Sequence, residues 1–252
     1  MAKLQTGVGW QDHKVVSRAE WTAARKEFLE KEKEFTRLRD ELSRLRRDLP
    51  WELVEKEYVF DGADDKVTLA QLFEGRSQLI IYHFMFGPGW QEGCKSCSFL
   101  ADHFNSFGVH LNARDVSMAA VSRAPISDLR AFEKRMGWTF KWVSTAETDF
   151  NSDYGVSFTD QEVATLSGTY NYRQGGHFPI TELPGISVFY RDSSGQIFHT
   201  YSTYGRGLDM LNVAYHYLDL VPKGRDEGDG NGTSWVRRRD EYGDSRASAE
   251  AR

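Results

Sequence analysis

The sequence predicts an α/β fold with a mixed central sheet. Short apolar strands alternate with helices from residue 57 onward, which is typical of α/β domains. A hairpin pattern across Asp192-Ser193-Ser194-Gly195 follows near the end of this region. Between them, an apolar strand leads through a tight loop into Cys94-Lys95-Ser96-Cys97, which opens a helix. We therefore expect one principal domain built around that pair of cysteines.

The first predicted element is a long amphipathic helix. A capping box at Ser17-Arg18-Ala19-Glu20 begins it, and Pro50 ends it after about 30 residues. Its apolar residues recur at three- and four-residue spacing with Lys31 interrupting them, and form one narrow seam: Trp21, Ala24, Phe28, Phe35, Leu38, Leu42, Leu45 and Leu49. Such a seam either packs across the chain's own domain or pairs with a second copy, so a homodimer through this helix stays open.

The remaining elements follow in the order β-α-β-α-β-β-α. We expect strands at 57–60, 79–86, 116–121, 140–143, 186–190 and 196–201, and helices at 67–73, 98–107, 126–136 and 208–220. Residues 144–183 lack periodicity, and a loop of that length usually carries function or covers a site. The polar composition after residue 223 predicts disorder. The expected division is an N-terminal extension at 1–50, a domain at 51–222 with an insertion at about 144–183, and a disordered tail at 223–252.

Composition excludes several classes of protein. The chain has a net charge of −5, and residues 50–222 alone carry −8, with 13 basic and 21 acidic side chains. Such an acidic domain attracts phosphates poorly, so we expect no nucleic-acid partner. The longest apolar run is too short to cross a bilayer, and the first residues lack a secretory signal core. We expect no membrane partner and a cytoplasmic location. Two cysteines in such a chain favour a redox-active dithiol over a disulfide scaffold.

The spacing of the two cysteines assigns each a different role. Cys94 lies at the start of a helix, where free amides and the helix dipole favour a thiolate, so we expect it to be the nucleophile. Cys97 lies one turn further in and is placed to resolve a mixed disulfide. Gly93 lets a substrate strand approach the backbone, and Trp90 is expected to cover the site as an apolar wall, although it also fits an ordinary loop aromatic. The expected partner is a disulfide or thiol, either protein or small molecule.

Metal and cofactor sites are not expected. A tetrahedral zinc site needs four ligands, and the chain holds no second CxxC motif. His103 and His110 follow on the same helix or just beyond it, which is unlike the usual ligand spacing. Haem attachment needs a histidine where Ser98 stands. We therefore expect no metal and no cofactor.

The order of elements around the CxxC pair resembles the thioredoxin-like superfamily over roughly residues 57–221, which implies a three-layer fold. Leu183-Pro184-Gly185-Ile186 is similar to the cis-proline loop of that fold. The resemblance implies that Pro184 packs against the dithiol and offers its backbone to the substrate. Residues 69–76 and 121–125 resemble the peroxiredoxin branch. The whole chain is similar to a bacterial thioredoxin-like family of unknown function with a long N-terminal helix, through the segments Thr36-Arg37-Leu38-Arg39-Asp40, Tyr82-His83-Phe84-Met85, Gly93-Cys94-Lys95-Ser96-Cys97-Ser98 and His199-Thr200-Tyr201-Ser202.

The resemblance leaves the reaction open. Gln91 stands where a peroxiredoxin needs a threonine, so a peroxidase-like variant ranks behind disulfide exchange. His83 lies near the position where thioredoxins bury a proton-relaying carboxylate, and is either such a relay or a core histidine bonded to its neighbours. The leading hypothesis is a thiol–disulfide oxidoreductase. A redox-sensing or protein-binding module without turnover also fits the residues, as does a small-molecule enzyme with incidental cysteines.

Overall fold

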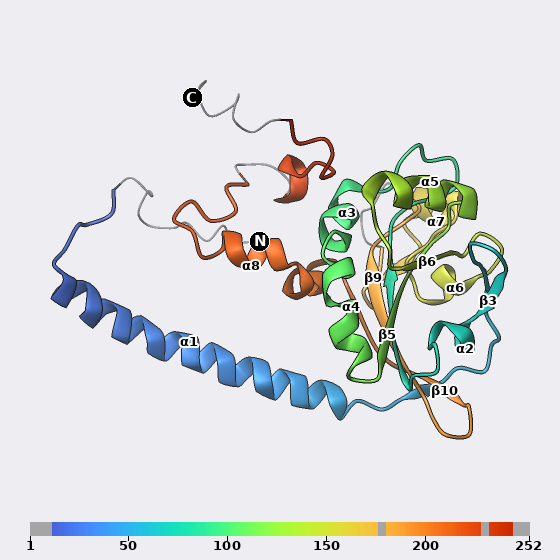
Figure 1. The fold of residues 1–252 in the computed structure, drawn as a ribbon, viewed down its shortest axis with the longest axis horizontal. Coiled ribbons are helices and arrows are strands. Elements are labelled where there is room, and N and C mark those ends of the chain that lie inside the picture. Colours follow the sequence, from blue (N-terminus) through green and yellow to red (C-terminus); the bar gives the residue numbers. More distant parts are fainter. Residues whose placement is uncertain (1–11, 176–179, 228–231, 244–252) are drawn as a thin grey trace. The chain divides into compact units, whose positions relative to one another are not determined.

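The structure is a computed structural model that describes residues 12–175, 180–227 and 232–243 (Figure 1). The chain forms two compact units. One comprises Met1–Pro50 with Leu218–Asp226, and the other comprises Trp51–Tyr217 with Glu227–Arg252. The cysteine pair belongs to the second unit.

The first unit contains helix α1 (Arg18–Arg47). Ser17 caps it as predicted: its Oγ accepts from the Glu20 amide at 3.3 Å, and its own amide donates to Glu20 Oε2 at 3.0 Å. None of its residues is buried, so its apolar seam finds no packed core within the helix's own unit. The homodimer through α1 stays a prediction.

The second unit is built on an eight-stranded sheet with the order β1-β10-β9-β4-β5-β6-β2-β3. Strand β4 lies near its centre, parallel to β5 and antiparallel to β9, so the predicted mixed sheet is confirmed. The strands are β1 (Glu52–Leu53), β2 (Val59–Asp61), β3 (Lys66–Thr68), β4 (Gln78–His83), β5 (Val116–Ser122), β6 (Lys141–Ser144), β9 (Gly185–Arg191) and β10 (Ile197–Tyr204). The insertion adds a small sheet of β7 (Thr169–Tyr170) and β8 (Arg173–Gln174).

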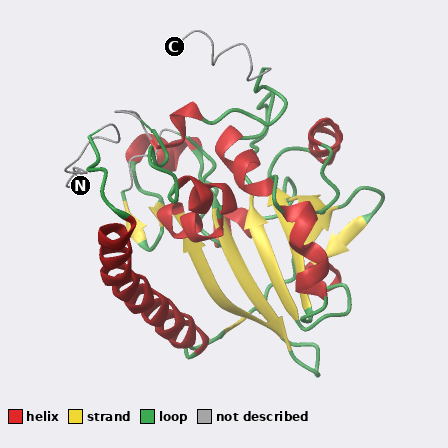
Figure 2. Cartoon of the chain, turned by 60° about the vertical axis from the view of Figure 1, so that its left-hand side comes forward, coloured by secondary structure: helices red, strands yellow, loops and turns green. Residues whose placement is uncertain are grey.

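Helices cover both faces of this sheet and complete three layers (Figure 2). One face carries α3 (Lys95–Ala101), α4 (Phe104–Asn112) and α5 (Ile126–Met136). The other carries α2 (Leu69–Leu72) and α6 (Phe150–Asp153). The remaining helices are α7 (Asp160–Thr165), a 3-10 turn at Gly205–Leu211, α8 (Val213–Leu218) and a second 3-10 turn at Gly232–Trp235.

Three predicted helices differ from the structure. The helix expected at 67–73 is shortened to α2, because Val67 and Thr68 belong to β3. The single helix expected at 98–107 is divided into α3 and α4, because the α-helical pattern stops at Asp102 and starts again at Phe104. The carboxylate of Asp102 accepts a hydrogen bond from Trp138 Nε1 at 2.8 Å at that point. The closing helix expected at 208–220 is a 3-10 turn followed by the short α8.

The core on the α3 face is strongly aromatic. Trp142 of β6 is fully buried, with its ring 4.7 Å from that of Phe84, and its Nε1 donates to Ser122 Oγ at 3.0 Å. Successive β4 residues alternate between faces, so Tyr82 joins this core while Ile81 packs on the α2 face. This alternation decides which β4 side chains reach the cysteines.

Part of the tail makes contacts with the rest of the chain. Residues 232–243 belong to the second unit, where Val236 is fully buried. Ion pairs and backbone bonds to the region around Cys94 hold them, and polar composition alone does not reveal such partners. The composition of the tail does not predict these contacts, and the disorder of the tail as a whole stays a prediction.

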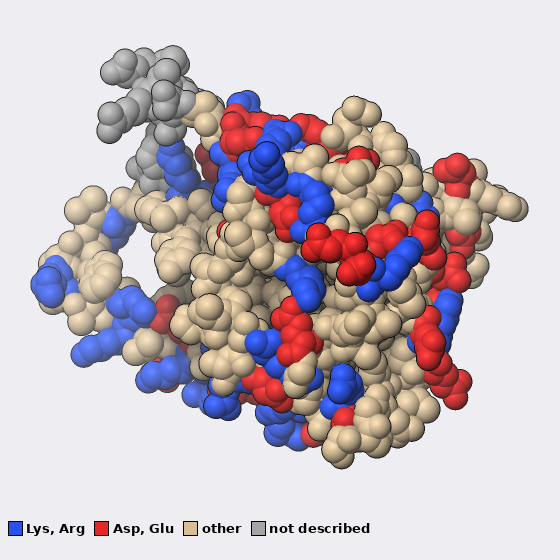
Figure 3. All heavy atoms as spheres, turned by 45° about the vertical axis from the view of Figure 1, so that its right-hand side comes forward, with Lys and Arg blue, Asp and Glu red and all other residues tan. Residues whose placement is uncertain are grey.

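The surface mixes charges of both signs. On the face drawn in Figure 3, Lys and Arg side chains are interspersed with Asp and Glu. Within the described ranges, no helix combines the length and the apolar character needed to cross a membrane.

Candidate functional site: the Cys94–Cys97 dithiol

The two cysteines lie at the end of the sheet where the central strand β4 terminates. After β4 the chain stays attached to the sheet, because the Phe84 amide donates to the Val121 carbonyl at 2.9 Å. The Cys94 amide then donates to the Met85 carbonyl at 3.0 Å, which brings Cys94 back to this end of the sheet as the N-cap of α3. Cys94 is half-buried, whereas Cys97, one turn further along α3, is only 2% exposed. The structure therefore reproduces the predicted difference in access to the two thiols.

The surroundings separate the pKa values of the two thiols. A hydrogen bond from the Cys97 side chain, with further bonds from the Cys97 and Ser96 amides, lowers the pKa of Cys94 to about 6 despite its partial burial. Burial raises the pKa of Cys97 well above its ordinary value, and the neighbouring Cys94 raises it further. At neutral pH the pair thus holds one thiolate and one thiol, as a nucleophile and a resolving group require.

The lowered pKa of Cys94 gives a testable pH dependence. The rate of Cys94 alkylation by iodoacetamide should rise with a midpoint near pH 6 and level off above about pH 7, because only the thiolate reacts. In Cys97→Ala the main stabilising hydrogen bond is lost, so this midpoint should move upward toward the free-cysteine value of about 8.5. Stopped alkylation followed by mass spectrometry measures both profiles. A midpoint at or above 8.5 in the unaltered chain would contradict the assignment.

Tyr82 lies at the dithiol, and Tyr170 lies close enough to feel the charge of Cys97. The Tyr82 hydroxyl is hydrogen-bonded to Cys97, and burial raises its own pKa. Tyr170, from the insertion, is close enough for the charge of Cys97 to raise the pKa of its phenol further, after burial has raised it. The alternation of side chains along the strand makes Tyr82 the alternative to His83 as a neighbour of Cys97, since the two residues must point to opposite faces. No local signal identifies Tyr170, because it comes from a segment without periodicity.

Pro184 lies at the same end of the sheet as the cysteines. It directly precedes β9, whose Gly185 pairs with His83 at the end of β4. Its carbonyl accepts a hydrogen bond from the Tyr170 hydroxyl at 2.7 Å. The peptide bond before Pro184 is trans, so the expected cis-proline loop is wrong in that respect. The Pro184 carbonyl already has a protein donor, and whether a substrate uses this backbone stays a prediction.

Gly93 has a packing reason to be glycine. A Cβ at this position would lie 2.7 Å from Phe84 Cε1 and 3.1 Å from Phe132 Cε1, which is too close for a side chain. The close approach is thus to aromatic rings of the core; the approach of a substrate strand stays a prediction. Trp90 is half-buried, packs against the α3-side core, and lines a surface pocket of about 400 Å³ together with Phe132 and Arg135.

His83 lies on the other face of the sheet. Its Nδ1 is 3.0 Å from Asn151 Oδ1, its Nε2 is 3.0 Å from Ser187 Oγ, and its ring stacks on Phe150. Burial lowers the pKa of His83 to about 4, so the ring is neutral at physiological pH. The structure therefore does not bring His83 together with Cys97, whose side-chain partners are Cys94 and Tyr82. The arrangement is that of a core histidine bonded to its neighbours.

A metal site finds no support in the described part of the chain, where no three His, Cys, Asp or Glu side chains come close enough together to hold an ion. His103 is the N-cap of α4, and His110 lies near the end of the same helix. What the site offers chemically is therefore the dithiol with its tyrosine neighbours.

The fold and the site define a thioredoxin-like protein: a mixed sheet between helical layers, with a CxxC pair opening the helix after the central strand. Residues 10–242 match the model of a bacterial family described as "bacterial protein of unknown function (DUF899)". The chain belongs to this family, which confirms the relationship that its signature segments predicted.

Known proteins add little beyond this. No curated protein matches the chain. Peroxidoxin BcpB from Mycobacterium tuberculosis is 11% identical, with 65% of this chain and 93% of that chain covered and a TM-score of 0.44. A variant of Xanthomonas campestris peroxiredoxin Q is 14% identical, and the alignment covers 68% of this chain and 98% of that chain with a TM-score of 0.44. A putative thiol:disulfide interchange protein DsbE from Chlorobium tepidum is 14% identical, and the alignment covers 66% of this chain and 97% of that chain with a TM-score of 0.40. None of these similarities assigns a reaction to this chain.

Proposed function

We propose that this protein is a thiol–disulfide oxidoreductase in which Cys94 is the nucleophile and Cys97 the resolving thiol. The observation that carries the proposal is the asymmetry of the pair. Cys94 is partly exposed, hydrogen-bonded and has a lowered pKa, whereas Cys97 is buried and has a raised pKa. An inert pair of packed cysteines has no need of such a difference.

The reaction balances over two exchange steps. The Cys94 thiolate attacks one sulfur of a substrate disulfide, forming a mixed disulfide and releasing the first substrate thiolate. Cys97 then gives up its proton and attacks the Cys94 sulfur, which releases the second substrate thiolate and leaves a Cys94–Cys97 disulfide. The substrate gains two electrons and the pair loses two. A dithiol or thiol reductant must restore the pair, and the reverse sequence oxidises a substrate dithiol.

Tyr82 fits the second step. Its hydroxyl is hydrogen-bonded to Cys97, and the bond from Tyr82 opposes the rise in the pKa of that thiol. Because Cys97 must lose its proton before it attacks, a donor to its sulfur stabilises the developing thiolate. We assign Tyr82 as a positioning residue for the resolving step.

The deciding experiment is a redox titration against glutathione. The chain is equilibrated at graded ratios of reduced to oxidised glutathione, alkylated and analysed by mass spectrometry. We expect a reversible, two-electron transition to a Cys94–Cys97 disulfide that has one midpoint and is absent in Cys97→Ala. If the pair stays fully reduced, or carries only glutathione adducts, across the whole range, the proposal fails.

A redox sensor without turnover is the second candidate. The observation that favours it is that Lys95 and Ser96, between the two cysteines, are both bonded to the C-terminal segment 232–243. A Cys94–Cys97 disulfide would constrain the first turn of α3, which carries these two contacts. If the protein is such a sensor, the glutathione titration succeeds, but catalytic reduction of a disulfide in the presence of a recycling thiol does not occur.

A further inference from the structure

Residues 232–243, hereafter the strap, lie directly over the beginning of α3. The Lys95 ammonium donates to the Ser234 carbonyl at 2.9 Å, and the Ser96 hydroxyl donates to Thr233 Oγ1 at 2.8 Å. Both residues between the cysteines are thereby bonded to the strap. No pattern in the sequence links these positions, which are more than 130 residues apart.

Arg238 connects the strap to the residue directly before Cys94. Its Nε and Nη2 both donate to the Gly93 carbonyl, at 3.2 and 2.9 Å. The Arg238 side chain is only 15% exposed, and its Nη1 is paired with Glu92 Oε2 at 2.8 Å and with Glu241 Oε1 at 2.8 Å. A partly buried guanidinium with this many acceptors is held in one geometry, because all three of its nitrogens are engaged.

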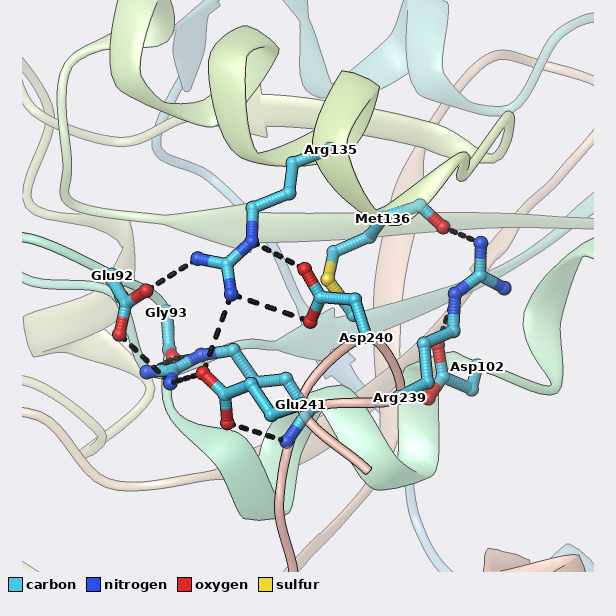
Figure 4. Close-up of polar contacts among 9 residues, drawn as sticks. Glu92, Gly93, Asp102, Arg135, Met136, Arg239, Asp240 and Glu241 are labelled. Carbon is cyan, nitrogen blue, oxygen red and sulfur yellow. Dashed lines mark hydrogen bonds and ion pairs between the residues drawn. The ribbon is translucent and has the colours of Figure 1, made fainter. Parts of the chain in front are cut away.

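Figure 4 shows that Arg135 of α5 also contacts both the strap and the Glu92–Gly93 loop. Its guanidinium pairs with Glu92, with Asp240 Oδ2 at 2.6 Å and with Glu241 Oε1 at 3.3 Å. Arg239 donates to the Met136 carbonyl on the far side of the strap. The strap is thus fixed to the loop before Cys94 and to the end of α5 at once.

Apolar contacts anchor the other part of the strap. Val236 is fully buried, and the Trp235 ring lies 5.5 Å from that of Phe99 in a T-shaped arrangement. Phe99 is part of α3 itself, two residues after Cys97. The strap therefore makes apolar contacts with α3 and polar contacts with the Glu92–Gly93 loop. The contacts of Arg238 with Glu92 and the Gly93 carbonyl are called the clasp below.

We infer that the strap is a substrate-size filter, which restricts the Cys94 thiolate to small-molecule disulfides and keeps out protein disulfides. This inference rests on the proposed exchange function and names its substrate class. A disulfide within a polypeptide brings flanking backbone to the surface around the nucleophile, and here Gly93, Lys95 and Ser96 are already occupied by the strap. Cys94 itself remains partly exposed with the strap in place, whereas Cys97 is buried, so a small reagent retains access to Cys94.

Two altered chains test the filter. The first ends after residue 231 and lacks the strap. The second, Arg238→Glu, keeps the whole chain but places a carboxylate against Glu92, so the clasp is replaced by repulsion. Arg114→Glu is the matched control, because it makes the same change of charge at an exposed residue beyond α4. Each is assayed for reduction of glutathione disulfide and of insulin, at low and high salt.

We expect the full chain and Arg114→Glu to reduce glutathione disulfide readily and insulin slowly. Both strap variants should gain at least about ten-fold in the rate of insulin reduction. In the full chain only the fraction of molecules with the strap displaced reacts with insulin, and both variants raise that fraction. Their rates with glutathione disulfide should change less than about three-fold. High salt should raise the insulin rate of the full chain relative to that of the shortened chain, because it screens the clasp.

The outcomes separate the two proposals. Glutathione disulfide reduced by every form, with insulin rates that do not rise in either strap variant, overturns the filter alone. Rates that rise equally for both substrates also overturn it, since the strap would then be a general cover. No reaction with either substrate in any form overturns the exchange function, and the filter with it.

Discussion

Replacement of Cys94 by serine is expected to abolish disulfide reduction, with a fall of at least about a thousand-fold in rate. A serine hydroxyl is not ionised at neutral pH, and the hydrogen bonds that lower the pKa of the Cys94 thiol do not make an alcohol nucleophilic. The measurement is the rate of glutathione disulfide consumption in the presence of a recycling thiol.

Cys97→Ala is the matched control, because it should fail at a different step. Cys94 still attacks, but no thiol resolves the mixed disulfide, so one glutathione should accumulate on Cys94 and be visible by intact mass spectrometry. If Cys94→Ser keeps the unaltered rate, or if Cys97→Ala turns over normally, the division of labour between the two sulfurs is refuted.

The second large effect concerns stability. Trp142→Ala should lower the free energy of unfolding by about 3–5 kcal/mol, because it empties a fully buried site in the aromatic core and leaves Ser122 Oγ without its indole donor. The neighbouring rings of Phe84 and Phe132 cannot collapse into the whole space, since each already packs against other rings. Denaturant unfolding followed by circular dichroism gives the difference.

Tyr217→Ala is the comparison for this substitution. Tyr217 is 69% exposed, so its removal should change the unfolding free energy by less than about 0.5 kcal/mol. Equal effects of the two substitutions would show that the aromatic core does not dominate the stability of the second unit.

The sequence predicted those features whose causes are local. The start of α1 depends on side-chain bonds between Ser17 and Glu20, three residues apart, and these bonds form as expected. The position of Cys94 at the start of α3 likewise follows from the strand, loop and helix pattern around it. The mixed sheet follows from parallel neighbours joined by helices and from the β9–β10 hairpin, whose turn residues are adjacent in the chain.

The features that escaped prediction depend on distant partners. Whether Tyr82 or His83 faces Cys97 is a choice between two faces of one strand, and the alternating pattern alone does not say which face α3 covers. The strap escaped because its charges appear solvated until Arg135 and Glu92, more than 100 residues away, are brought against them. Tyr170 escaped because it comes from a segment without periodicity, and its hydroxyl bonds to Pro184 and Gly205, 14 and 35 residues further along the chain.

The place of the strap in the chain has a consequence for biosynthesis. Translation proceeds from the N-terminus, so residues 51–217, which hold the sheet and the dithiol, are synthesised before residues 232–243. During that interval the Gly93 carbonyl and the Lys95 ammonium have no strap partner. The nascent chain therefore lacks the proposed filter, and we expect protein disulfides to reach Cys94 more readily at this stage than in the finished chain.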